Sequence, residues 1–97
     1  MRYYSAKADA NQPEIVNEFR RLGANVEHVH RLKNFCDLFV LYRGVVVAVE
    51  VKMPGKEKLT DGEDKFAKRW YENGGKYAVI TSTTEAQALI NQIAEYA

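Results

Sequence analysis

The chain has 97 residues, of which 46% are hydrophobic, and its formal net charge of +1 neither requires nor excludes a nucleic-acid partner. This length supplies one hydrophobic core, so we expect a single domain over residues 1–97 and not two. The single cysteine cannot form an internal disulfide, no apolar run approaches the roughly 20 residues of a membrane-spanning helix, and the N-terminus lacks the apolar segment of a signal peptide, so we expect a cytoplasmic protein.

A polar arm over residues 1–10 precedes the first predicted helix. Pro13 belongs in a first helical turn, apolar residues from Ile15 onward recur at helical spacing, and Gly23 ends the helix. The weak alternation of residues 25–31 then predicts a first strand, which a loop connects to the most apolar part of the chain.

Two apolar runs in the middle of the chain predict a β-hairpin. Leu38–Tyr42 and Val45–Val51 are rich in β-branched and aromatic residues, and the Arg43-Gly44 pair between them favours a tight turn. A two-residue or four-residue turn pairs Val40 with Val47, whereas a three-residue loop with a bulge would shift the register.

The second half of the chain predicts a helix, a strand and a final helix. Thr60 with Glu63 fits a capping box, and the helix that follows ends at Asn73-Gly74-Gly75. Residues 77–81 form a compact predicted strand, and a second capping box at Ser82 begins a helix that runs to the C-terminus.

The resulting order of elements is α-β-β-β-α-β-α, which indicates the α/β class with a mixed sheet. Both faces of the predicted hairpin are apolar. We therefore expect helices to cover both faces of a central mixed sheet.

Three charged residues stand at fixed places in this apolar hairpin. With the two-residue turn, Asp37 lies directly opposite Glu50, and their Cβ atoms are expected about 5 Å apart. Side chains alternate along a strand, so Lys52 shares the face of Glu50. Two carboxylates held side by side repel each other unless a cation or a proton lies between them.

These three groups suggest a metal-dependent reaction on a phosphate. Carboxylate oxygens suit Mg²⁺ or Mn²⁺, which keep several waters and also accept a substrate phosphate. The Lys52 ammonium would then lie beside a metal-bound water or the charge that develops on the phosphate. The alternative interpretation is three ordinary strand-end charges, with one salt bridge and one solvated carboxylate.

The same residues resemble the signature of PD-(D/E)XK nucleases, in which an Asp begins one strand and a Glu-x-Lys ends the next. Here the signature consists of Asp37 and Glu50-Val51-Lys52, and Cys36 stands where that superfamily usually has Pro. The resemblance extends over most of the chain, through Trp70 and Gly74-Gly75, and is greatest to small stand-alone VRR-NUC proteins of phages and prophages. Archaeal-type Holliday junction resolvases are similar more distantly.

This resemblance implies a restriction-endonuclease-like core and a Mg²⁺-dependent endodeoxyribonuclease that uses no organic cofactor. Asp37 and Glu50 would bind the metal together with a backbone carbonyl, that of Val51, and Mn²⁺ would substitute for Mg²⁺. Lys52 would orient the attacking water and stabilise the transition state.

Two further positions are compared with the same family. The family often has a Glu on its first helix that reaches the metal, and Glu14 matches it, with Glu18 as the alternative; the helical pattern equally allows a solvent-facing Glu14. The family commonly has a Gln on the second helix where this chain has Glu63. For Glu63 we favour a capping role over metal binding.

Basic residues occupy the N-terminal arm and the loops around the hairpin, where phosphates would be contacted. They are Arg2, Lys7, Arg31, Lys33, Lys56 and Lys58. We expect DNA contacts from Lys33, Lys56 and Lys58 in particular, while an ordinary mixed-charge surface is the alternative.

Three more residues have a structural interpretation. His28 and His30 would point to one face of the first strand, but without a nearby third ligand we interpret them as polar strand residues. We interpret Cys36 as a small buried filler.

The family resemblance also implies an oligomeric state and a DNA substrate. Stand-alone VRR-NUC proteins are implied to be homodimers that cut four-way DNA junctions, and a two-fold dimer presents two sites to a two-fold substrate. We therefore expect a homodimeric Holliday junction resolvase, located in the cytoplasm of a bacterial host cell if it is phage or prophage encoded. Candidate dimer surfaces are the helix with Trp70 and Tyr71 and the strand near Tyr77. The alternatives are a nuclease for flap or nicked DNA and a non-catalytic DNA-binding or partner-binding module that retains the fold.

Overall fold

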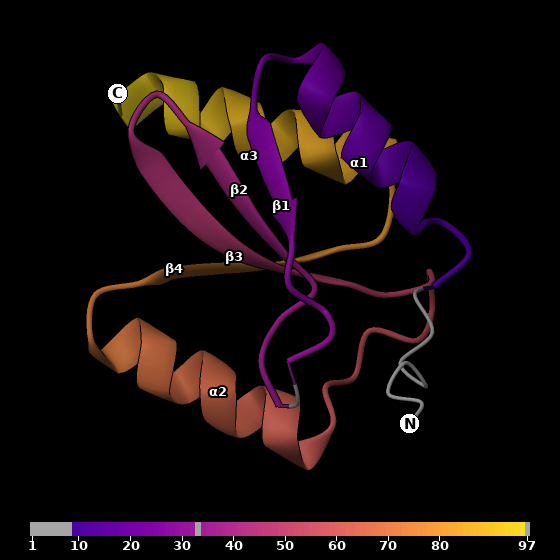
Figure 1. The fold of residues 1–97 in the computed structure, drawn as a ribbon, viewed down its shortest axis with the longest axis vertical. Coiled ribbons are helices and arrows are strands. Elements are labelled where there is room, and N and C mark those ends of the chain that lie inside the picture. Colours follow the sequence, from indigo (N-terminus) through magenta and orange to yellow (C-terminus); the bar gives the residue numbers. More distant parts are fainter. Residues whose placement is uncertain (1–8, 33, 97) are drawn as a thin grey trace.

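The computed structural model describes residues 9–32 and 34–96, which form seven secondary-structure elements in the predicted order (Figure 1). The helices are α1 (Gln12–Arg21), α2 (Asp61–Glu72) and α3 (Thr83–Tyr96), and the strands are β1 (Asn25–His28), β2 (Leu38–Tyr42), β3 (Val45–Val51) and β4 (Lys76–Ile80). The first strand is shorter than predicted, because the chain leaves the sheet after His28. Among the described residues, no helix combines the length and the apolar character needed to cross a membrane.

In the described part of the chain the four strands form one mixed sheet in the order β1-β2-β3-β4. β2 is antiparallel to both of its neighbours, whereas β3 and β4 are parallel and are joined by the crossover that contains α2. The carboxyl ends of β3 and β4 therefore meet at one end of the sheet, where Val51 pairs with Ile80. The mixed sheet was predicted correctly.

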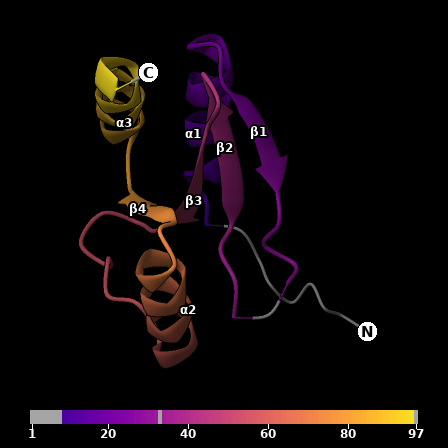
Figure 2. The ribbon, with the colours of Figure 1, turned by 90° about the vertical axis from the view of Figure 1, so that its left-hand side faces the viewer.

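Alternating side chains of the sheet form two cores, one on each face. Val47 and Val49 of β3 belong to a core that α1 and α3 cover, whereas Ala48 between them belongs to a core that α2 covers. Figures 1 and 2 show α1 and α3 together at one end of the molecule and α2 at the other end. Helices cover both faces of the sheet, as predicted.

Arg43 and Gly44 form a two-residue turn between β2 and β3. Both residues have positive φ, 50° and 80°, which is the conformation of a type I′ hairpin turn. The register that follows pairs Val40 with Val47, and the predicted register of the hairpin is confirmed.

An aromatic cluster holds α2 against the sheet. Phe66 and Trp70 of α2 pack with Phe35 and Phe39, and ring centroids in this cluster are 4.8 to 5.8 Å apart. The indole N–H of Trp70 also donates a hydrogen bond to the carbonyl of Lys76 at 2.8 Å. These contacts fix α2 beside the carboxyl end of the hairpin and leave Trp70 half-buried. Dimerisation through the helix with Trp70 and Tyr71 stays a prediction.

The start of α1 is tied to the carboxyl ends of the two parallel strands. The side-chain amide of Asn11 donates to the carbonyls of Lys52 and Thr81, both at 3.0 Å. Ile15 and Phe19, on the next turns of α1, are fully buried in the core beneath the sheet. α1 therefore braces the strand end that carries the charged residues.

We expect Leu38→Ala to lower the free energy of unfolding by about 2–5 kcal/mol, because Leu38 is fully buried and its truncation leaves a cavity. Leu41→Ala on the same strand is the matched control, since Leu41 is 40% exposed, and we expect it to cost less than about 1 kcal/mol. Urea denaturation measures both losses. Equal losses in the two variants would contradict the assignment of the two faces of β2.

Candidate active site

Asp37 and Glu50 face each other where the hairpin leaves the sheet. Leu38 pairs with Val49, so Asp37 and Glu50 occupy the next position along the ladder. The backbone N–H of Asp37 donates to the carbonyl of Val49 at 3.1 Å, which holds Asp37 against β3 at the end of the ladder. The backbone N–H of Val51 donates to Oδ2 of Asp37 at 2.8 Å, and this bond orients the carboxylate. The structure thus brings the two predicted carboxylates together.

Burial makes the negative charge of this pair costly. The pKa of Glu50 is raised to about 9, first by burial and then by the charge of Asp37. Burial also raises the pKa of Asp37, although the N–H of Val51 opposes that effect. Glu50 is 4% exposed, and its Oε1 has no hydrogen-bond partner among the described residues. The pair therefore requires a proton or a cation.

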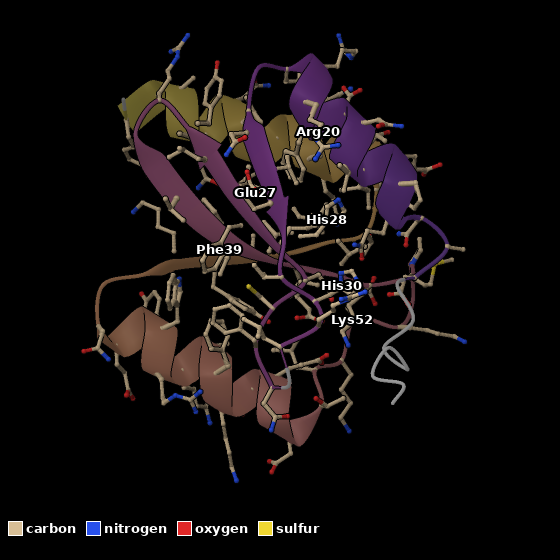
Figure 3. The ribbon with its side chains drawn as sticks, in the orientation of Figure 1. Arg20, Glu27, His28, His30, Phe39 and Lys52 are labelled. Carbon is tan, nitrogen blue, oxygen red and sulfur yellow. The ribbon has the colours of Figure 1, made fainter. Side chains whose placement is uncertain are left out.

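Lys52 lies on the same face as Glu50 and forms an ion pair with Glu63. Its Nζ is 2.8 Å from Oε1 of Glu63, and the two side chains are only 15% and 20% exposed. Burial lowers the pKa of Lys52, but the hydrogen bond to Glu63 and the nearby carboxylates outweigh it, so the pKa is raised. Figure 3 shows Lys52 at the end of the sheet that is nearest to the first turn of α2.

Glu63 has the predicted capping role and a second role that the sequence reading did not assign. Its backbone N–H donates to Oγ1 of Thr60 at 3.2 Å, and its Oε1 accepts the N–H of Thr60 at 2.9 Å, which completes the capping box. The same Oε1 accepts a hydrogen bond from the ammonium of Lys52. Asp37, Glu50, Lys52 and Glu63 therefore form one charged cluster. A charged residue on the first turn after the Glu-x-Lys segment was the signal for this contact.

The structure does not bring Glu14 to the cluster. Glu14 is exposed on α1, and Glu18 pairs with Arg21 and Gln87. Neither residue contributes to the shifted pKa values of the two opposed carboxyls. The described part of α1 therefore offers no acidic side chain to this site.

Gln12 is the polar residue that α1 buries instead. It is 3% exposed, its Oε1 has no hydrogen-bond partner among the described residues, and its Nε2 lies 3.5 Å from Nδ1 of His28. Sequence reasoning missed it, although Gln12 shares the helical spacing of Ile15, Val16 and Phe19 and therefore lies on their buried stripe.

Three more polar groups lie around the carboxylate pair. Burial raises the pKa of Asp37, and the nearby His30 opposes that rise. Nδ1 of His30 is buried without a partner among the described residues. Burial, followed by the charge of Glu50, raises the pKa of Tyr77, and within the described residues its hydroxyl also lacks a partner. Cys36 is 2% exposed, as expected of a filler, and burial raises its pKa to about 12.

The donor set fits a hard divalent cation that keeps most of its waters. Among the described residues, no group of three or more His, Cys, Asp and Glu side chains is arranged to hold a metal. Mg²⁺ typically binds through one or two carboxylates plus water and substrate phosphate, which Asp37 and Glu50 can supply. The unpartnered Oε1 of Glu50 is the observation that favours this fit.

The structure describes only some of the basic residues that were predicted to contact DNA. Lys56 and Lys58 are exposed in the segment that connects β3 to α2. Lys33, Arg2 and Lys7 lie outside the described residues. DNA binding by these residues stays a prediction.

A solved structure described as "VRR_NUC domain" has a TM-score of 0.68 with this chain at 24% sequence identity. The match covers 86% of this chain and 97% of that one. The chain has the VRR_NUC fold. This fold is the one that the sequence resemblance implied. In this chain the side chains of Asp37, Glu50 and Lys52 lie close enough to shift one another's pKa values. No protein-family model and no curated protein matches the sequence.

In the metal-free protein, we expect stability to fall as the pH rises from about 5 to about 9. The raised pKa of Glu50 means that the folded state holds a proton that the unfolded state has lost. Its contribution is fully present below the ordinary value of 4.5 and disappears as the pH passes through about 9. Urea denaturation in EDTA measures the trend.

Glu50→Gln should make stability less dependent on pH in this range, because it removes the titrating group. Glu72→Gln, at an exposed acidic position of α2, is the matched control and should keep the dependence of the wild type. A wild-type dependence that Glu50→Gln leaves unchanged would contradict the electrostatic account of this pair.

Proposed function

We propose that this protein is a Mg²⁺-dependent endodeoxyribonuclease of the VRR-NUC family, in which Mn²⁺ can replace Mg²⁺. The observation that carries the proposal is the interacting pair of buried Glu50 and half-buried Asp37 at the end of the hairpin of a VRR_NUC fold. A purely structural protein would gain nothing from two carboxylates that repel each other in its interior.

Asp37 and Glu50 would hold the metal, together with the carbonyl of Val51. Bound Mg²⁺ supplies Lewis acidity to the scissile phosphate and to the attacking water. Glu50 has to release its proton before it can serve as a ligand, because its pKa in the metal-free protein is about 9. The N–H of Val51 occupies Oδ2 of Asp37, and the Asp37 and Glu50 carboxyls also share a hydrogen bond, which the metal would replace.

Lys52 would orient the water and stabilise the negative charge that develops on the phosphate. The water oxygen forms a bond to phosphorus while the bond from phosphorus to the leaving sugar oxygen breaks, and the products are a phosphomonoester and a hydroxyl. Exposed Lys56 and Lys58, on the segment after Lys52, would contact neighbouring phosphates of the DNA backbone.

The finer form of the proposal is a homodimer that resolves four-way junctions. Two features of the described residues support a second copy at β4, because β4 lies at the edge of the sheet and Tyr71 beside it is 76% exposed. A groove next to the start of β4 is also lined by Leu89 and Tyr96. A two-fold dimer would offer two sites to a substrate with two-fold symmetry.

We expect the wild type to cleave labelled DNA with Mg²⁺ or Mn²⁺ and not with EDTA. Asp37→Asn and Lys52→Ala should each lower the rate by at least about 100-fold, since they remove a metal or transition-state contact and not core volume. Lys65→Ala is the matched control for Lys52→Ala, because Lys65 is 68% exposed on α2. Circular dichroism checks that each variant is folded, and equal rates for the wild type and Lys52→Ala would contradict the mechanism.

Four-way junction DNA should be cleaved faster than duplex, nicked, flap or single-stranded DNA of the same sequence, and the protein should sediment as a dimer. Parallel cleavage assays and analytical ultracentrifugation test both statements. A preference for flap or nicked DNA would reassign the substrate and leave the nuclease intact. Tight DNA binding without cleavage under any metal would favour a non-catalytic module.

A further inference from the structure

The ion pair of Lys52 and Glu63 connects two separate parts of the fold. Lys52 directly follows β3, whereas Glu63 belongs to the first turn of α2. Nζ of Lys52 and Oε1 of Glu63 are 2.8 Å apart, and both side chains are mostly buried. The other ion pairs on α2, Asp61 with Lys65 and Asp64 with Lys68, are exposed contacts within the helix. The Lys52 pair is therefore the ion pair that joins α2 to the end of β3, and the same Glu63 side chain also hydrogen-bonds the Glu50 carboxyl.

Glu63 is held rigidly, in contrast to most surface glutamates. Its Oε1 accepts the N–H of Thr60 at 2.9 Å, and its own N–H donates to the hydroxyl of Thr60 at 3.2 Å. One turn further along, Phe66 fixes α2 against Phe35 of the loop before β2. Burial opposes the charge of Glu63, but the hydrogen bonds from Lys52 and Thr60 outweigh it and lower its pKa. Glu63 therefore presents a fixed anion.

Lys52 needs such an anchor because its ammonium is a compact charge on a flexible four-carbon stem. Its neighbours include the two opposed carboxyls, since both Glu50 and Asp37 contribute to its raised pKa. Without Glu63, the ammonium would move toward these carboxylates, because they would be its remaining buried acceptors. It would then occupy the position that a divalent cation needs.

The charge balance of the cluster agrees with this division of roles. Three carboxylates, those of Asp37, Glu50 and Glu63, and one ammonium, that of Lys52, leave two negative charges when all are ionised. One divalent cation neutralises them. The positive charge of Lys52 neutralises Glu63, so the charges of Asp37 and Glu50 are left for the divalent cation to neutralise.

We propose that Glu63 is a positioning residue, which holds the Lys52 ammonium beside the reacting phosphate and away from the cation position between Asp37 and Glu50. This inference rests on the proposed nuclease function, because the reacting phosphate belongs to that function. The inference goes beyond the nuclease function because it gives Glu63 a role in the reaction, in addition to its capping of α2.

Three variants test the proposal. Glu63→Ala removes both the anchor and half of the capping box, whereas Glu63→Gln keeps an oxygen that accepts from Lys52 and from Thr60. Thr60→Ala is the matched control, because it removes the hydroxyl cap of the same helix end and leaves the Lys52 contact in place. Each variant is compared with the wild type in kcat, KM for DNA, Mn²⁺ affinity by calorimetry and thermal unfolding.

Glu63→Ala should lower kcat by about 10-fold or more with little change in KM, and it should weaken Mn²⁺ binding. Glu63→Gln should restore most of kcat. Thr60→Ala should lower the unfolding temperature without these losses. Equal losses of kcat in Glu63→Ala and Thr60→Ala would overturn the proposal, because helix capping would then explain the effect, and so would a Glu63→Gln variant as slow as Glu63→Ala.

The ¹⁵N resonance of the Lys52 ammonium in the metal-free protein tests positioning separately from cleavage. We expect it to shift in Glu63→Ala and to stay in place in Thr60→Ala. An unchanged resonance in Glu63→Ala would overturn the positioning role even if the wild type cleaves DNA. Absence of cleavage by the wild type would instead overturn the nuclease assignment, whatever this resonance shows.

Discussion

The carboxyl groups of Asp37 and Glu50 oppose each other inside the protein because a two-residue turn fixes the register of the hairpin. Side chains alternate between the faces of a strand, so a slip of one residue would move the valines of β3 out of their core and Glu50 into it. The left-handed conformation of Arg43 and Gly44 and the burial of Val47 and Val49 select the same register. Turn chemistry and core packing thus place the charged pair together.

This arrangement costs stability in the metal-free protein. A buried acid that holds its proton up to about pH 9 has not found a partner that satisfies its charge. The surrounding groups add to the cost, since Tyr77 and His30 also bury polar atoms that have no partner in the described residues. A fold under selection for stability alone would replace such a cluster with apolar side chains, whereas a site that receives a cation and a phosphate needs it.

Local patterns in the sequence predicted most of the fold and the centre of the site. The hairpin register and the capping box of Thr60 with Glu63 depend on residues close in sequence, and both are confirmed. Contacts between distant elements were harder to predict. Capping alone does not reveal that Glu63 also reaches Lys52, because this depends on where the aromatic cluster places α2.

On the first helix, the resemblance and the helical pattern pointed to different residues. The resemblance to a family with an acidic residue on this helix directed attention to Glu14, yet the helical spacing of Ile15, Val16 and Phe19 places Gln12 on the buried stripe and Glu14 outside it.

Two helices, α1 and α2, fix the position of Lys52 from opposite faces of the sheet. On one face, Asn11 at the start of α1 binds the carbonyls of Lys52 and Thr81 and so fixes the backbone on which the Lys52 side chain begins. On the other face, α2 fixes the end of that side chain through Glu63. Lys52 is held at its backbone by one helix and at its ammonium by another. The position of this half-buried ammonium is thus set by the packing of both cores, although the catalytic candidates lie on the hairpin or directly beside its strands.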